Sequence, residues 1–247
     1  MYESIEVSNL GAFYRITAPF DEALRTLDEL HIARPVSWHE LALARMSQSP
    51  GNALSQKGAF VQEAVIYTEN GPTYYVRESP LLQYDYCTAA VKLHDLLFTA
   101  QGTPDAHSGF GEIYFGVVVP RARYEKIRTQ AKRDAKKPPE ERYVFTLATR
   151  KNFRIPAGEF TDHDLMRFLF RSKALAKSYG EFLLDAGITE SPIWLLDWLE
   201  PFRYRKPIIR QLYFGNVPQG SSVNGGRRLG FDDGAMGGTW GLKEGYE

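Results

Sequence analysis

Apolar and polar positions recur along this chain with two different periods, which together predict a mixture of strands and helices. Residues 11–18 (GAFYRITA) are rich in aromatic and β-branched side chains and stop before Pro19, a pattern typical of a strand that ends at a turn. Residues 20–32 instead place apolar side chains at helical spacing. The chain therefore opens with a predicted strand followed by a predicted helix.

The next segments predict a second helix and a hairpin. Ser37 followed by Glu40 has the spacing of a capping box, so we expect a short helix to begin there. Two strand-like runs, residues 59–68 and 72–79, flank Asn70-Gly71, a strong hairpin signal. Residues 84–100 then predict an amphipathic helix, and residues 112–120 predict an apolar strand that ends at Pro120.

The second half repeats a similar order. A basic helix is expected from Arg121 to the Pro138-Pro139 pair, and a strand with alternating apolar side chains is expected over residues 143–150. One capped helix is predicted from Thr161 to about Gly187, followed by extended segments at 192–202 and 206–215. The order favours an α+β protein with a boundary near Pro120.

Charge is unevenly distributed in a chain whose net charge is zero. Residues 1–120 hold seven lysines and arginines against fourteen acids, whereas residues 121–210 hold twenty against twelve. A surface that concentrates cations favours a polyanionic partner. The densest part of this basic region contributes Arg121, Arg123, Lys126, Arg128, Lys132, Arg133, Lys136 and Lys137 as candidate RNA-binding residues.

Glycine is concentrated at the end of the chain. Ten of the twenty-one glycines lie between Gly215 and Gly245, and Arg227 and Arg228 stand at the centre of this run. Glycine permits close approach of a backbone to a ligand, and arginine holds phosphate through two parallel hydrogen bonds. This glycine-rich loop therefore predicts contact with a phosphodiester backbone, with a flexible polar tail as the alternative.

Several function classes lack their motifs. The chain has no phosphate loop of the GxxxxGK[ST] type, no HExxH and no GxSxG. The single cysteine, Cys87, allows no internal disulfide, and the five histidines lack metal-ligand spacing, so we expect no metal and no cofactor. No apolar run is long enough for a membrane span, which favours a cytoplasmic protein without a membrane partner.

One local pattern is informative about nucleic acid. Residues 108–115 (SGFGEIYF) match five of the seven constrained positions of an RNA-recognition strand, failing at Ser108 and Glu112. Phe110 would stack on a base if this strand faced outward, although a loop followed by a buried strand has the same composition. For proton transfer, His31 and His39 are the candidate acid and base groups, because imidazole titrates near neutral pH.

The order of these features resembles the RAMP superfamily of CRISPR-associated RNA-binding proteins. The segments VVVPRARYEKIRTQAKR, RFLFRSKALAKSYG, GGTWGLKEGY and VRESPLL are similar to the type IV CRISPR endoribonucleases that process precursor guide RNA. The resemblance implies tandem ferredoxin-like (RRM/RAMP-type) units, at 1–120 and 121–247, the second carrying the basic helix and the glycine-rich loop.

The resemblance also implies a reaction and partners. A metal-independent endoribonuclease would bind a CRISPR repeat hairpin, cleave it by attack of the ribose 2′-OH, and stay bound among other CRISPR effector subunits. Its implied catalytic residues are Arg25, Arg34, His39 and Arg228. Two alternatives stay open: a non-catalytic RAMP subunit that clamps the 5′ handle of the guide RNA, and a protein-interaction module.

Overall fold

The computed structural model describes most of the chain. The described ranges are 2–7, 10–18, 20–31, 34–48, 50–68, 71–83, 117–119, 121–149, 151–195, 207–225 and 238–242. Predictions that fall on other residues, such as the helix over 84–100, lie outside the described residues.

The described helices are six α-helices and four short 3₁₀ turns. The α-helices are α1 (Phe20–Glu29), α2 (Trp38–Met46), α3 (Ala53–Gln56), α6 (Arg121–Asp134), α7 (Asp164–Phe170) and α8 (Lys173–Asp185). The 3₁₀ turns are η1 (Pro80–Gln83), η2 (Pro139–Glu141), η3 (Ala157–Glu159) and η5 (Val217–Gln219).

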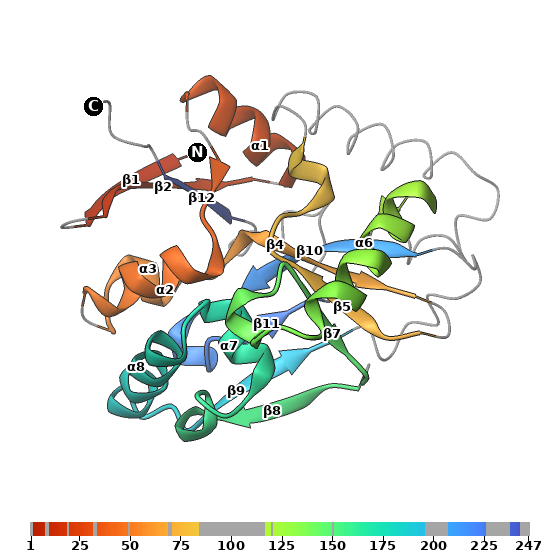
Figure 1. Ribbon diagram of the computed structural model, residues 1–247. Helices are drawn as coiled ribbons and strands as arrows, with labels where there is room; N and C mark the ends of the chain where they lie inside the picture. Colours follow the sequence, from red (N-terminus) through yellow and green to blue (C-terminus); the bar gives the residue numbers. More distant parts are fainter. Residues whose placement is uncertain are drawn as a thin grey trace, which may run out of the picture.

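The described strands form one sheet (Figure 1). They are β1 (Tyr2–Val7), β2 (Gly11–Thr17), β3 (Arg34–Pro35), β4 (Ala59–Tyr67), β5 (Thr73–Val76), β6 (Val117–Val118), β7 (Val144–Leu147), β8 (Phe153–Pro156), β9 (Glu190–Trp194), β10 (Ile208–Phe214), β11 (Val223–Asn224) and β12 (Gly238–Leu242). The main path runs β1-β2-β12-β4-β10-β11-β9-β8, with β5 joining β4 to β7.

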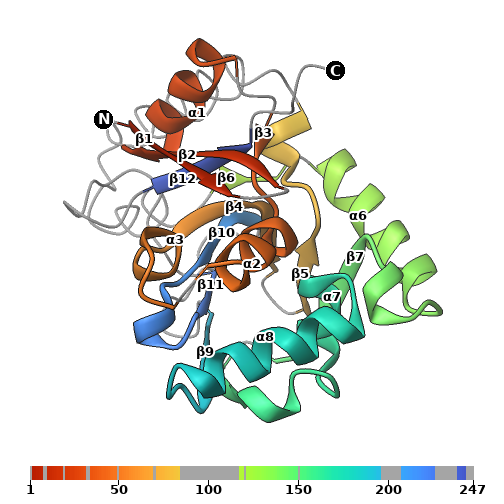
Figure 2. The same cartoon turned by 90° about the vertical axis from the view of Figure 1, so that its left-hand side faces the viewer.

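The sheet separates two apolar clusters, because successive residues of a strand point to opposite faces. On β4, Val61 and Val65 pack with α2, α7 and α8, whereas Phe60, Ala64 and Ile66 pack with α1 and α6. Figure 2 shows α2, α7 and α8 grouped on the side that faces the viewer. Strands β4 and β10, antiparallel to each other, form the centre, and every residue of β10 is buried.

Several local predictions are confirmed. The capping box at the start of α2 is present, since the Ser37 side chain accepts from the Glu40 amide and the Glu40 carboxylate accepts from the Ser37 amide. Strands β4 and β5 pair antiparallel on either side of the predicted turn. The basic helix is α6, and it ends at Asp134, four residues before Pro138.

The single helix predicted from Thr161 to Gly187 is instead two helices. Arg171, at the end of α7, has φ of 56°, a left-handed conformation that stops a right-handed helix. The Ser172 side chain then accepts from the Leu175 amide and caps α8. Helical periodicity continues through both segments, so the break is set by this two-residue junction and not by the apolar pattern.

The predicted fold class, α+β with tandem ferredoxin-like units, is wrong in its architecture. Strand β12, from the glycine-rich end of the chain, inserts between β2 and β4 from the beginning of the chain. Strands from both halves thus pair in one sheet, and the backbone hydrogen bonds that would define two separate ferredoxin-like sheets are made across the halves. The division near Pro120 stays a prediction about which parts fold independently.

Candidate functional site

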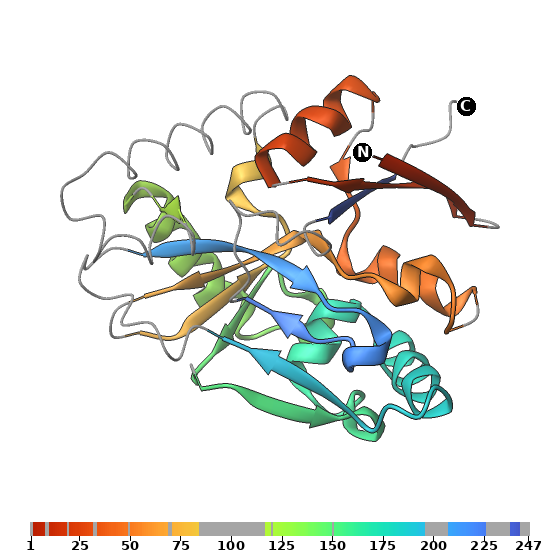
Figure 3. The same cartoon turned by 180° about the vertical axis from the view of Figure 1, so that it is seen from behind.

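A groove of about 280 Å³ lies where β9, β10 and β11 meet the turn η5. Figure 3 shows β10, β11, β9 and β8 side by side, with the turn beyond the end of β10. We call this site the amide groove, since three of its side chains are carboxamides. Its lining residues are Pro192, Trp194, Tyr213, Gly215, Asn216, Gln219, Ser222 and Asn224.

Strand register brings three of these side chains into one row. Asn224 of β11 is paired with Trp194 of β9 and with Tyr213 of β10. Residues directly opposite one another on neighbouring strands point to the same face of a sheet. Trp194 is 42% exposed, so the row ends in an indole ring open to solvent. The row on the opposite face is buried in the core and consists of Ile193, Val223 and Phe214.

The turn η5 shapes one wall of the amide groove. Gly220 ends the turn with φ of 84°, and a Cβ at this position would lie 2.9 Å from Cδ of Pro192. Asn216 precedes the turn, and its Nδ2 donates to the Gln56 carbonyl at 3.3 Å. Its Oδ1 is buried without a hydrogen-bond donor among the described residues. Buried acceptors are normally satisfied, so this amide oxygen is a candidate to accept a hydrogen bond from a bound molecule.

A buried arginine fixes the backbone of the groove from below. Arg45 of α2 is 0% exposed and donates to three carbonyl groups. They belong to Leu54 at 2.8 Å, Gly215 at 2.9 Å and Lys57 at 2.9 Å. The guanidinium also stacks 4.1 Å from the ring centroid of Phe214. Arg45 thereby holds the end of β10 against the loop around α3, and so positions Gly215 at the groove.

A second polar network holds the segment that follows η5. Ser221 has φ of 49°, a conformation uncommon outside glycine and asparagine. Its Oγ lies 2.9 Å from the Tyr179 hydroxyl of α8, and its carbonyl accepts from Ser191 Oγ at 2.9 Å. These buried hydrogen bonds connect α8 and β9 to the turn, so the groove is built on rigid elements.

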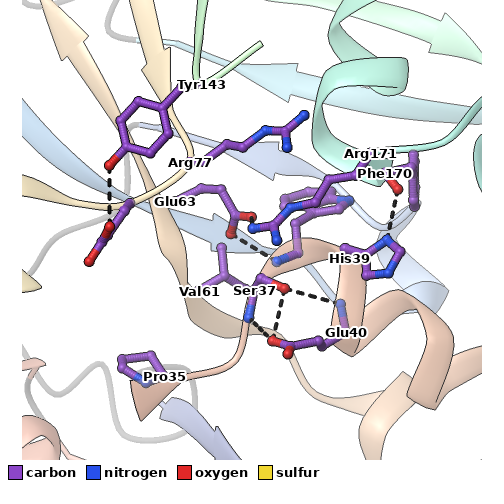
Figure 4. A network of polar contacts seen from close by, with 12 residues as sticks. Pro35, Ser37, His39, Glu40, Val61, Glu63, Arg77, Tyr143, Phe170 and Arg171 are labelled. Atoms are coloured by element: carbon purple, nitrogen blue, oxygen red, sulfur yellow. Dashed lines mark hydrogen bonds and ion pairs between the residues drawn. The ribbon is translucent and has the colours of Figure 1, made fainter. Parts of the chain in front are cut away.

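A buried carboxylate occupies the other side of the sheet (Figure 4). Glu63 of β4 is 1% exposed, and its Oε2 accepts from the Trp38 amide at 2.8 Å. Arg171 approaches its Oε1 at 3.2 Å. Burial raises the pKa of Glu63 to about 7, and the attraction of Arg171 and the hydrogen bond from Trp38 offset burial only in part. Arg77 lies beside Arg171, and burial together with that neighbouring cation lowers its pKa.

Stability is expected to depend on pH through Glu63. Folding raises the pKa of this carboxyl from 4.5 to about 7, so the folded state binds its proton more tightly than the unfolded state does. Stability should therefore fall as pH rises from about 4.5 to 7, by up to about 1.4 kcal/mol per pH unit. Glu63→Gln should remove this slope. Urea unfolding at pH 5, 6 and 7 checks it, and an unchanged slope in the variant would contradict the assignment.

Two of the predicted catalytic residues, Arg34 and His39, lie near the start of α2. Arg34 forms an ion pair with Glu40, in which Nη1 lies 2.7 Å from Oε2. Burial alone raises the pKa of Glu40, but hydrogen bonds from Arg34 and Ser37 outweigh it and lower the pKa to about 2. His39 Nδ1 lies 2.8 Å from the Phe170 carbonyl. Both side chains thus make contacts that anchor α2.

The remaining predicted residues are dispersed. Arg25 lies on α1, half-buried, and Arg228 lies outside the described residues, as do Arg227 and Phe110. The candidate RNA-binding residues on α6 do not share one face: Arg123 and Lys126 line a separate groove, whereas Lys132 and Arg133 are exposed and do not. Lys136 and Lys137 follow the helix and are exposed. Arg121 and Arg128 complete the set on α6, Arg128 paired with Glu125 at 3.1 Å.

No sequence pattern predicts the amide groove. Trp194 lies in a segment predicted only to be extended and apolar, and Asn216, Gln219 and Asn224 lie in the predicted glycine-rich loop. The sequence offers only a tryptophan in an extended segment and three carboxamides more than twenty residues further along, which is no specific signal. Register across β9, β11 and β10 is what brings them together, and register is not visible in the sequence.

Metal-binding clusters and membrane-spanning helices are both absent from the described residues. No group of three or more His, Cys, Asp or Glu side chains there is arranged to hold a metal ion. None of the described helices has the length and apolar character that crossing a membrane requires. The predicted cytoplasmic location stays a prediction.

Comparison with known proteins identifies the fold. No protein-family model matches the chain, and no curated protein does. A solved structure matches it, described as "Accommodation of massive sequence variation in Nanoarchaeota by the C-type lectin fold". The TM-score is 0.64 at 15% sequence identity, over 96% of this chain and 100% of the other. At this identity the match shows the fold alone, and the chain therefore has the architecture of the C-type lectin fold.

The resemblance to RAMP proteins is accordingly wrong, and so is the function inferred from it. The predictions of a CRISPR guide-RNA endoribonuclease and of a clamp for the guide RNA came from that resemblance together with the basic surface and the glycine-rich loop, and the match to a C-type lectin fold does not support them. The matched fold is a different one, and in this chain β12, from the glycine-rich segment, lies between β2 and β4 in the single sheet. A basic helix and a high glycine content are general features of composition, and a chain with the C-type lectin fold can have both.

Proposed function

We propose that this chain is a binding protein whose amide groove holds a carbohydrate. The observation that carries the proposal is the row of Tyr213, Asn224 and Trp194, in which a carboxamide stands beside an exposed indole. Asn216, Gln219 and Ser222 line the same groove. The shared fold supports a binding role, since the Nanoarchaeota structure is described as accommodating massive sequence variation on this scaffold.

The chemistry of the groove suits a sugar. A carboxamide presents both a donor and an acceptor, which matches hydroxyl groups that also do both. The face of a sugar ring that carries C–H bonds is apolar and packs against an aromatic ring, as the exposed face of Trp194 allows. The groove, at about 280 Å³, is near the lower limit of small-molecule sites, so we expect a terminal or short saccharide.

Trp194→Ala is expected to weaken saccharide binding at least tenfold, equal to about 1.4 kcal/mol, because the stacking surface is lost. The ligand is first found by applying the labelled full chain to a glycan array, and its affinity is then measured by isothermal titration calorimetry. Leu184→Ala is the matched control, since Leu184 is also an exposed apolar side chain, 45% exposed, but lies on α8 outside the groove.

The carboxamides provide a second, independent readout. Gln219→Ala and Asn224→Ala should each weaken the same ligand about fivefold, the value of one hydrogen bond of about 1 kcal/mol. Failure of every glycan on the array to bind, or equal affinity in the wild type and in Trp194→Ala, would rule out this role for the groove. Circular dichroism of each variant verifies that the fold is retained.

A further inference from the structure

We propose a second binding site, for a short peptide that carries an acidic side chain next to an aliphatic one. The site is a groove of about 430 Å³ between α6, β7 and the segment that follows β5. We call it the α6 groove. Its lining residues are Val76, Glu78, Pro80, Arg123, Lys126, Ile127, Gln130, Tyr143 and Val144. It shares no residue with the amide groove, so the two proposals can fail separately.

Helical spacing accounts for one wall of the α6 groove. Arg123, Lys126, Ile127 and Gln130 stand at positions i, i+3, i+4 and i+7 of α6, which form one stripe on a helix. Two turns of helix cover about 10 Å. An extended peptide advances about 3.3 Å per residue, so the stripe spans about three residues of a bound strand. The dimensions therefore suit a short peptide segment.

The floor of the α6 groove is aliphatic. Val76 of β5, Val144 of β7 and Ile127 of α6 are 1%, 1% and 9% exposed, and all three belong to the apolar cluster on that side of the sheet. An aliphatic side chain placed there would bury its own apolar surface against this existing core. The floor thus favours an occupant with at least one residue such as leucine.

The rim of the α6 groove is cationic. Lys126 is exposed and forms no ion pair among the described residues, and Arg123 lines the groove beside it. Glu78 is the acid of the rim, and it accepts a hydrogen bond from the Tyr143 hydroxyl at 3.2 Å. Two cations against one acid select a carboxylate on the occupant. Gln130 donates through Nε2 to Asp134 at 3.0 Å, which leaves its amide oxygen for a peptide N–H.

A buried acid holds the two walls together. Asp134, 0% exposed, ends α6, and its Oδ2 accepts from the amides of Tyr143 and Val144 at 2.8 and 2.9 Å. Burial raises the pKa of Asp134, but hydrogen bonds from Lys137, Val144 and other donors outweigh burial and lower it. The carboxylate stays ionised, and α6 stays fixed against β7. A groove with rigid walls pays little entropy when a peptide binds.

Fluorescence anisotropy of a labelled dodecapeptide tests the proposal on the full chain. The probe contains glutamates with one central leucine, and its partner peptide has serine in place of leucine. We expect the leucine peptide to bind, and the serine peptide to bind at least tenfold more weakly. Lys126→Glu should weaken the leucine peptide at least tenfold, whereas Glu78→Gln should strengthen it, because a repulsive charge is removed.

Lys132→Glu is the matched control, since Lys132 lies on the same helix and carries the same charge but does not line the groove. It should change the affinity less than threefold. Equal loss in Lys126→Glu and Lys132→Glu, or equal affinity for the two peptides, would show general attraction to a basic helix and overturn the site. Absence of binding by both peptides would overturn it as well.

Discussion

Replacement of Arg45 by methionine is expected to lower the free energy of unfolding by about 4 kcal/mol. The side chain is fully buried, and its guanidinium donates to the carbonyls of Leu54, Lys57 and Gly215. Methionine fills a similar volume but donates no hydrogen bond, so three buried acceptors would lose their partner, at about 1–3 kcal/mol each before relaxation. Urea unfolding followed by circular dichroism measures the loss.

Arg34→Met is the control for Arg45→Met. Arg34 lies just before α2, whereas Arg45 lies within it, and both arginines form charged hydrogen bonds. The Arg34 side chain is 32% exposed, however, and that of its partner Glu40 is 21% exposed. Partly exposed ion pairs contribute about 0–1 kcal/mol, so this variant should lose less than about 1 kcal/mol. If both variants lose the same amount, Arg45 does not hold the groove in the manner described.

The second large effect is expected for Gly180→Ala, which should destabilise the protein by up to about 2 kcal/mol. Gly180 is buried on α8, and a Cβ there would lie 2.2 Å from the carbonyl oxygen of Ala157. That oxygen belongs to the backbone, so relief requires α8 to move away from η3, at a cost of about 1–3 kcal/mol or more. Alanine improves helix propensity by about 1 kcal/mol, which reduces the net loss.

Gly158→Ala supplies the comparison for Gly180→Ala. Gly158 lies in η3, on the other side of the same contact, and a Cβ there would meet no atom within 4 Å. The variant should therefore unfold within about 0.5 kcal/mol of the wild type. Thermal unfolding of the two variants separates them, and a stable Gly180→Ala protein would mean that α8 packs less closely on η3 than the structure shows.

Local sequence patterns predicted most of the individual elements in the described residues. The capping box of Ser37 and Glu40 fixed the start of α2, because both hydrogen bonds are made within four residues of chain. The β4–β5 hairpin followed from its turn for the same reason. Prediction failed at Arg171, where a left-handed residue divides α7 from α8, since only the packing around that junction selects the conformation.

The candidate site was much less predictable. Its exposed indole and its amides come from residues 192–224, and they converge because β11 pairs in parallel with β9 and antiparallel with β10. The basic residues of α6, in contrast, were correctly placed on a helix, yet of these only Arg123 and Lys126 line the α6 groove. The prediction of RNA binding rested on their charge alone and therefore assumed that the whole helix forms one surface.

The sequence by itself determined the helices α1, α2 and α6, the strands β2, β4, β5 and β10, and where cations and glycines are concentrated, because those properties depend on neighbours within a few residues. Only the tertiary structure decided that the last described strand, β12, inserts between β2 and β4, and that Arg45 supports the groove from beneath. The physical reason is that backbone hydrogen bonds between distant strands are nearly independent of side-chain identity. Their pairing is chosen by how the whole apolar surface is buried.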